Sequence, residues 1–244
     1  MIDRLIVNIL EWAAGHHDEG RYSPVAILFH WTMAALVVFQ LGWGWWMGRL
    51  PVGGNKVAAY DLHFAIGVLM LVLALGRGGW RLLAPGPIND ADKPGWESTA
   101  ARITHGVFYA CLFGLPLSGW LMVSATAREE NLSLLGFIPW PLIPLADLSP
   151  PQRWAVEGVG EWMHWGLIVS LLAMIPIHVL GALKHQVIDR DDVFHGMLPI
   201  VPKPPRRRTG WQRRYRAVEQ RVGALARRLW RAFPLPSARR PRPS

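Results

Sequence analysis

The fold is decided by residues 161–184, which read EWMHWGLIVSLLAMIPIHVLGALK. Apolar residues run through this stretch without leaving a polar face, and its length meets the requirement of about 20 residues for a helix that crosses a bilayer. It carries two histidines, His164 and His178, which are 14 residues apart. In a helix this spacing places them about 40° apart around the axis and about 21 Å apart along it. We therefore expect a transmembrane helix that presents two stacked histidines on one face.

Three further windows have the length and apolar character of membrane spans: Pro24–Met47, Ala58–Leu82 and Ile103–Ala127. The whole chain of 244 residues is 51% hydrophobic and only 18% charged, which is typical of a membrane protein. We expect an all-α fold, an integral membrane four-helix bundle over residues 24–200. A polar lead-in, residues 1–23, precedes this bundle, and a basic tail, residues 201–244, follows it.

Lysine and arginine residues predict how the bundle is oriented. They gather before the first span, around the loop between the second and third spans, and after Lys184. The opposite side carries only four of them: Arg49, Lys56, Arg128 and Arg153. Loops rich in these residues stay in the cytoplasm. Both termini and the middle loop are therefore expected on the cytoplasmic side.

The tail has a composition of its own. From Lys203 onward it holds fourteen Lys and Arg residues against one acidic residue, Glu219. Apolar residues recur there at steps of four and three: Trp211, Tyr215, Val218, Val222, Leu225 and Leu229. This pattern predicts a basic amphipathic helix on the anionic inner leaflet of the membrane. Docking of a partner protein is an alternative, whereas nucleic acid is not expected, because a tail tethered to a membrane meets lipid first.

Five histidines lie in or at the edges of the expected spans, where an ionisable side chain indicates function: His30, His63, His105, His164 and His178. His63 and His164 each follow an acidic residue closely at the outer end of their spans. His30 and His178 each lie six residues from the cytoplasmic end of theirs. Depth alone therefore predicts an outer pair, His63 with His164, and an inner pair, His30 with His178.

The residue types limit what these pairs can hold. The chain has one cysteine, Cys111, which excludes an internal disulfide, a Cys-x-x-Cys zinc site, a chain-borne iron–sulfur cluster and a covalently attached haem. Zinc and proton relays would both require further ligands or carboxylates that the bundle core lacks. A non-covalent b haem is apolar and accepts two imidazoles as axial ligands. We expect two such haems, and because both axial positions are filled, they would transfer electrons rather than bind oxygen.

Several motifs extend beyond the histidine pairs. They are Tyr22-Ser23 with His30-Trp31, His63, His105-Gly106, Leu115–Met122, the block His178–His185, Arg190-Asp191 and Met197-Leu198-Pro199. Over about residues 22–200 the chain thereby resembles the bacterial cytochrome b561 family. The block from His178 to Pro199 is the most specific part of this resemblance, because Ala-Leu-Lys-His, Arg-Asp and Met-Leu-Pro at these distances are hard to obtain by chance.

The resemblance implies a bundle in the bacterial inner membrane with two b haems. It gives axial roles to the same four histidines: His30, His63, His164 and His178. It also implies a quinone site at the cytoplasmic side near His185 and Lys93. His105 is expected to neighbour a ligand or the quinone rather than to serve as a fifth ligand.

Two functions are compatible with this arrangement. Proteins similar to this one oxidise superoxide at the outer face and reduce ubiquinone, and basic groups on the outer side would steer the superoxide anion. In the alternative, the chain is a haem-carrying membrane anchor that relays electrons between quinone and a dedicated partner, such as a periplasmic redox protein. A haem-free scaffold is a third interpretation, but it would make four depth-matched histidines a coincidence.

Overall fold

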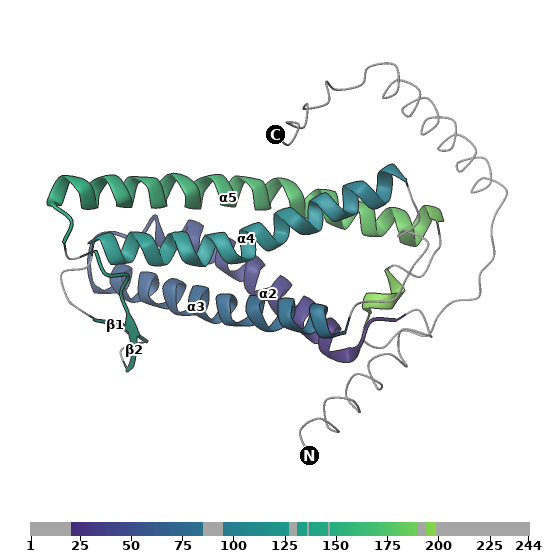
Figure 1. Cartoon of the computed structure of the whole chain (residues 1–244), viewed down its shortest axis with the longest axis horizontal. Helices are drawn as coiled ribbons and strands as arrows, with labels where there is room; N and C mark the ends of the chain where they lie inside the picture. The colour runs from purple at the N-terminus through teal and green to yellow at the C-terminus, as the bar shows by residue number, and fades with distance from the viewer. Residues whose placement is uncertain are drawn as a thin grey trace, which may run out of the picture.

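The computed structural model describes residues 21–84, 95–126, 131–135, 137–145, 147–189 and 194–198. Its long helices are α2 (Pro24–Met47), α3 (Gly54–Leu83), α4 (Trp96–Thr126) and α5 (Pro150–Lys184), shown in Figure 1. Each of the four is long and apolar enough to cross a membrane. The predicted all-α membrane bundle is thereby confirmed. The predicted basic helix of the tail lies outside the described residues.

The first span begins where the sequence predicted. Ser23 caps α2, since its hydroxyl oxygen accepts a hydrogen bond from the backbone N–H of Ala26 at 3.4 Å, and Pro24 occupies the first turn. The last span begins earlier than predicted, at Pro150 instead of Glu161. Hydropathy marks only the part of a helix inside lipid, whereas a good cap at Ser149 lets α5 start well before it.

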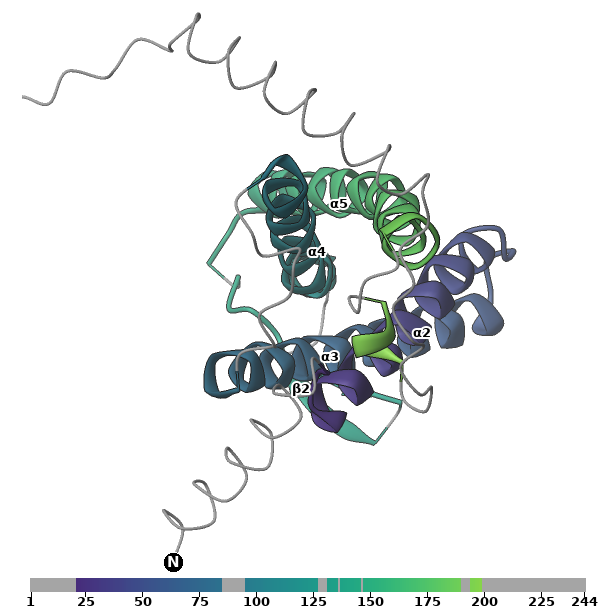
Figure 2. The ribbon, with the colours of Figure 1, turned by 90° about the vertical axis from the view of Figure 1, so that its right-hand side faces the viewer.

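The four helices pack as two neighbouring pairs. The contact between α4 and α5 is the most extensive, and α2 packs on α3, which in turn packs on α4. Helix α5 approaches α2 and α3 much less closely. Figure 2 looks along the bundle and shows α4 and α5 on one side, with α2 and α3 on the other.

Glycines bring α4 and α5 together. A Cβ atom added at Gly160 of α5 would lie 2.7 Å from Met122 Cγ and 3.4 Å from the Ser118 carbonyl oxygen. One added at Gly114 of α4 would lie 2.7 Å from Leu167. Both positions exclude any larger residue without a shift. Small residues of this kind let membrane helices approach until their backbones nearly touch.

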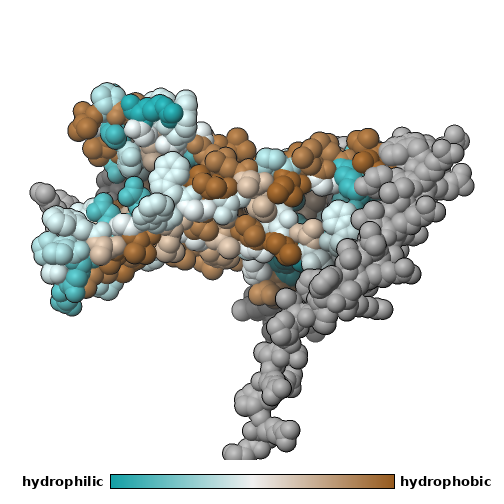
Figure 3. Space-filling view, turned by 90° about the horizontal axis from the view of Figure 1, so that it is seen from above, coloured by the Kyte–Doolittle hydropathy of each residue, from teal (hydrophilic) through white to brown (hydrophobic). Residues whose placement is uncertain are grey.

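The outside of the bundle is apolar. Large exposed side chains occur on all four helices, among them Leu28, Val38, Val72, Ile103 and Val169. Figure 3 shows such apolar side chains along the outside of the bundle. Several of the fully buried side chains are small and polar, such as Ser23 and Ser118. This distribution suits a lipid environment, in which hydrogen-bonding groups must be satisfied inside the protein.

We call the end of the bundle that holds Pro24 the inner end. Two indole N–H groups join its parts: Trp31 donates to the Met197 carbonyl at 2.8 Å, and Trp80 donates to the Ser23 hydroxyl at 2.9 Å. Met197 and Leu198 therefore lie against the start of α2. The turns η2 (His185–Asp189) and η3 (His195–Met197) lead the chain to this contact from the end of α5.

A β-hairpin lies at the opposite, outer end (Figure 1). Its strands β1 (Asn131–Leu134) and β2 (Ile138–Pro141) pair antiparallel, with Leu132 opposite Trp140. The indole N–H of Trp120 donates to the Pro141 carbonyl at 2.9 Å. The hairpin is thereby attached to the outer end of α4.

Replacing Gly160 with Ala should lower the stability of the bundle by about 1–3 kcal/mol, because the new methyl group overpacks the contact between α4 and α5. Gly158→Ala is the matched control, since a Cβ there would meet no described heavy atom within 4 Å. It should leave stability unchanged or slightly raised. Thermal unfolding of the detergent-solubilised protein, followed by circular dichroism, measures both. Equal melting temperatures would contradict the close packing.

Candidate functional site

The outer pair joins α3 to α5. The ring centroids of His63 and His164 lie 6.4 Å apart, and the ring planes are inclined by 67°. Behind His63, a Cβ added at Gly44 of α2 would lie 3.3 Å from the ring Cε1 atom. Behind His164, the Ser118 hydroxyl oxygen lies 2.9 Å from Nδ1. The structure thus brings together the two histidines that depth had paired, each with a neighbour that holds its ring.

The inner pair joins α2 to α5. The ring centroids of His30 and His178 lie 6.1 Å apart. A third histidine, His105 of α4, lies beside His178 at 5.7 Å, and the Phe108 ring packs edge-on against His178 at 5.2 Å. His105 is exposed, whereas His30 and His178 are partly buried. The inner end therefore gathers three imidazoles around one point of α5.

The distances within both pairs fit a shared iron. A metal–imidazole bond of about 2 Å, plus about 1 Å from ring nitrogen to ring centre, separates two opposed rings on one metal by about 6 Å. The observed separations are 6.1 and 6.4 Å. Among the described residues, no hydrogen bond joins the two rings of either pair, and Nδ1 of His63 is buried without a partner. The two rings of each pair therefore lie at the spacing expected of axial ligands.

The pairs also lie across the loosest helix boundaries of the bundle. Each joins α5 to a helix that α5 approaches only loosely. The two positions on α5 are 14 residues apart, which corresponds to about 21 Å. The residues thus fit two haems at different depths of the membrane. The role of these histidines as ligands stays a prediction.

Arg77 is one of the basic residues around the loop after the second span, which in the sequence indicated only the orientation of the bundle. It lies near the inner end of α3, close enough to act electrostatically on both His30 and His178. A guanidinium in this place suits the propionate groups of a haem held by the inner pair. Its only signal in the sequence is a cation within the last two turns of an apolar span.

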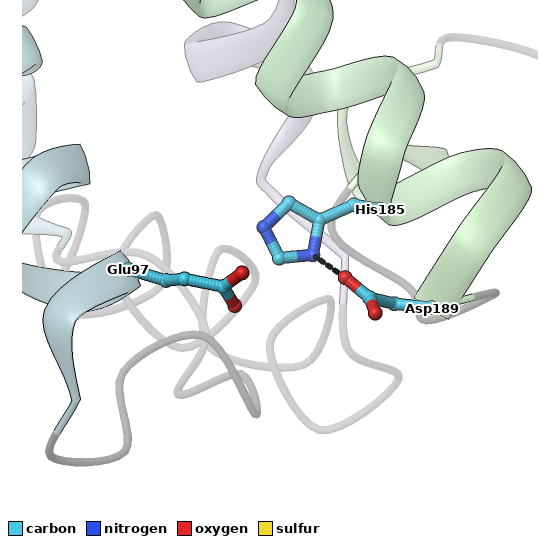
Figure 4. A group of neighbouring side chains, drawn as sticks. All are labelled: Glu97, His185 and Asp189. Carbon is cyan, nitrogen blue, oxygen red and sulfur yellow. Dashed lines mark ion pairs between the residues drawn. The ribbon is translucent and has the colours of Figure 1, made fainter. Parts of the chain in front are cut away.

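Charged side chains cluster at the inner end, where α4 begins and α5 ends (Figure 4). The ammonium of Lys184 contacts the carboxylates of Glu97 and, at 2.8 Å, Asp189. The imidazole Nδ1 of His185 lies 3.4 Å from the same Asp189 oxygen. Lys184 supplies one positive charge to two carboxylates, so these three groups together carry a net charge of −1 beside His185. The cluster places His185 at the inner end as predicted, while Lys93 lies outside the described residues.

Comparison with known proteins finds similar sequences over most of the chain. The sequence model of prokaryotic cytochrome b561 matches residues 21–199. Cytochrome b561 homolog 2 of Escherichia coli (strain K12) is 31% identical over 179 residues, which cover 73% of this chain and 91% of that protein. Cytochrome b561 homolog 1 of the same strain is 24% identical over 182 residues, 73% of this chain and 97% of that protein. A probable superoxide oxidase CybB of Yersinia pestis is 23% identical over 184 residues, 73% and 96% of the two chains.

Gly44→Ala should disturb the outer pair, because its methyl group would press on His63 and move the ring by a few tenths of an ångström. We expect haem to leave the outer site about tenfold faster, a typical effect of removing support from a metal ligand. Gly42→Ala is the control on the same helix, since a Cβ there would meet no described atom within 4 Å. Haem transfer to an excess of apo-globin measures both. The same rate in the two variants would show that Gly44 does not support His63.

Proposed function

The chain belongs to the prokaryotic cytochrome b561 family, and on this premise we propose that it carries electrons across the bacterial inner membrane through two bis-histidine b haems. As a member of that family it is a bacterial membrane cytochrome that binds haem b and transfers electrons. The observation that carries the proposal is the pair of imidazole separations, 6.1 and 6.4 Å, at two depths of α5.

In this proposal His63 and His164 hold the outer haem, and His30 and His178 hold the inner haem. When bound, each haem supplies a one-electron carrier whose potential depends on its ligands and their surroundings. Two imidazoles on each iron leave no coordination position for oxygen. The ligands on α5 set the spacing of the two carriers, and Arg77 supplies positive charge beside the inner one.

Ubiquinone is the proposed acceptor at the inner end. Its reduction to quinol requires two electrons and two protons, so the site needs groups that hold protons close to the inner haem. His185 suits this role, because an imidazole can carry a proton and its Nδ1 lies 3.4 Å from the Asp189 carboxylate. Lys184 holds Asp189 in place by their contact at 2.8 Å.

Superoxide is the proposed donor at the outer end. Arg49, stacked at 3.6 Å over the Trp45 ring, and Lys56, bonded at 3.2 Å to the Leu50 carbonyl, place positive charge there. Such charges steer a small anion to a haem edge. Two superoxide ions would each give up one electron and leave as oxygen, and one quinone would take up both electrons with two protons. The similarity to a probable superoxide oxidase supports this donor.

A redox partner protein is the alternative donor. Helix α5 has 35 residues, which span about 52 Å and exceed the hydrocarbon thickness of about 30 Å. Its outer part therefore extends beyond the lipid, where Trp154 is 71% exposed. Exposed aromatic side chains are frequent in protein interfaces. Co-purification of a redox subunit through this surface would favour the alternative.

His63→Ala and His30→Ala should each remove one of two haems, because each leaves an iron with a single protein ligand. Pyridine haemochrome quantification and reduced-minus-oxidised spectra measure the haems per chain. His105→Ala is the control at the inner end and should keep both. Loss of a haem in His105→Ala but not in His30→Ala would reassign the inner ligand. Fewer than two haems in the wild type would overturn the proposal.

The donor is tested by supplying superoxide to the quinone-loaded protein and following haem reduction. Reduction should outpace spontaneous dismutation, and Arg49→Gln together with Lys56→Gln should slow it, most strongly at low salt, because steering is screened by ions. Arg102→Gln, at the start of α4 and far from the outer end, should have no effect. Haem reduction no faster than dismutation would exclude superoxide as the donor. A redox partner protein would then be the remaining candidate donor.

A further inference from the structure

We propose that Ser118 is a positioning residue for the outer haem: its hydroxyl oxygen accepts a hydrogen bond from Nδ1–H of His164 and thereby directs Nε2 toward the iron. The inference rests on the proposed function, since it assumes a haem between His63 and His164. It adds a residue to the site that touches the ligand and not the iron.

The position of Ser118 suits this role. It lies on α4, 1% exposed, at the contact with α5. Its oxygen is 2.9 Å from Nδ1 of His164 and 3.0 Å from the carbonyl oxygen of Leu115, one turn earlier in its own helix. A Cβ at Gly160 would lie 3.4 Å from the Ser118 carbonyl, so the two backbones are close at this level. The hydroxyl is therefore enclosed by protein at a fixed distance from the ring.

The direction of the hydrogen bond follows from the number of protons. A serine hydroxyl has one proton and two lone pairs. Because the Leu115 oxygen can only accept, the hydroxyl donates its proton there. With that proton used, the contact at Nδ1 is one in which the imidazole N–H of His164 donates, and the Leu115 carbonyl beside it favours the same tautomer. A neutral imidazole protonated at Nδ1 carries its lone pair at Nε2, as an axial ligand requires.

The two ligands of the outer haem are therefore supported differently. Nδ1 of His63 is buried without a hydrogen-bond partner among the described residues, and Gly44 supports that ring by contact alone. His164, by contrast, has acceptors behind it: the Ser118 hydroxyl at 2.9 Å from Nδ1, and the Leu115 carbonyl close by. An acceptor at the far nitrogen fixes the ring and strengthens its donation to the metal. Stronger donation favours ferric over ferrous iron, so Ser118 should lower the potential of the outer haem specifically.

Cys111 provides a matched control. It lies seven residues before Ser118, on the same face of α4, and is also 1% exposed. Its thiol contacts α5 as well, but at the Leu167 carbonyl, 3.6 Å away, and not at a histidine. Cys111→Ala and Ser118→Ala thus remove similar small groups from the same helix contact. Only Ser118→Ala removes a hydrogen bond to a proposed haem ligand, His164.

The test is a potentiometric titration of both haems, with low-temperature EPR of the oxidised protein, in the wild type, Ser118→Ala and Cys111→Ala. Ser118→Ala should raise one midpoint potential, leave the other in place and alter one of two low-spin signals. Cys111→Ala should change neither. A double variant with Ser118→Ala and His30→Ala should contain only the outer haem. Its single midpoint potential should show the same rise as in Ser118→Ala, relative to His30→Ala.

Two results would count against the proposals in different ways. Unchanged potentials and signals in Ser118→Ala, or the same change in Cys111→Ala, would overturn the role of Ser118 while leaving the haem ligands intact. A His63→Ala variant that keeps every haem of the wild type would instead overturn the outer ligand assignment. A third result would support the positioning role: Ser118→Ala loses the outer haem and keeps the midpoint potential of the inner haem, while Cys111→Ala keeps both haems.

Discussion

Imidazoles on α5 that face imidazoles on α2 and α3 are the interaction on which this structure depends. Lipid tails are as apolar as leucine, so water exclusion gives membrane helices little reason to associate. Helix α5 packs closely on α4 but only loosely on α2 and α3. The histidine pairs are what spans that looser boundary. In the proposed function a haem at each pair joins the two halves of the bundle, so that binding and assembly are one event.

The close contact between α4 and α5 gives the pairs a rigid support. Gly114 and Gly160 allow these two helices to approach until little space remains between them. This approach brings the Ser118 hydroxyl within hydrogen-bonding distance of His164. The same helix contact thereby serves packing and ligand orientation. A site on helices held this firmly keeps its geometry better than one on loops.

The inner end is organised differently, by hydrogen bonds and charge. Trp31 and Trp80 tie the turn after α5 and the end of α3 to the start of α2. Lys184 joins α4 and α5 through Glu97 and Asp189. Buried charges of this kind are tolerated because each has a partner. The polar contacts lie next to the inner pair, where a quinone would require protons.

The sequence by itself determined the spans and the depth of each histidine, because both follow from local hydropathy and from a constant rise per residue. It could not determine which residue of a neighbouring helix faces each ring. Nothing in the immediate sequence marks Gly44 or Arg77, and the motif Leu115–Met122 contains Ser118 without indicating which ring it contacts. Their importance arises from the rotation and separation of whole helices. Only the tertiary structure decides these, because they depend on how distant side chains fill the space between backbones.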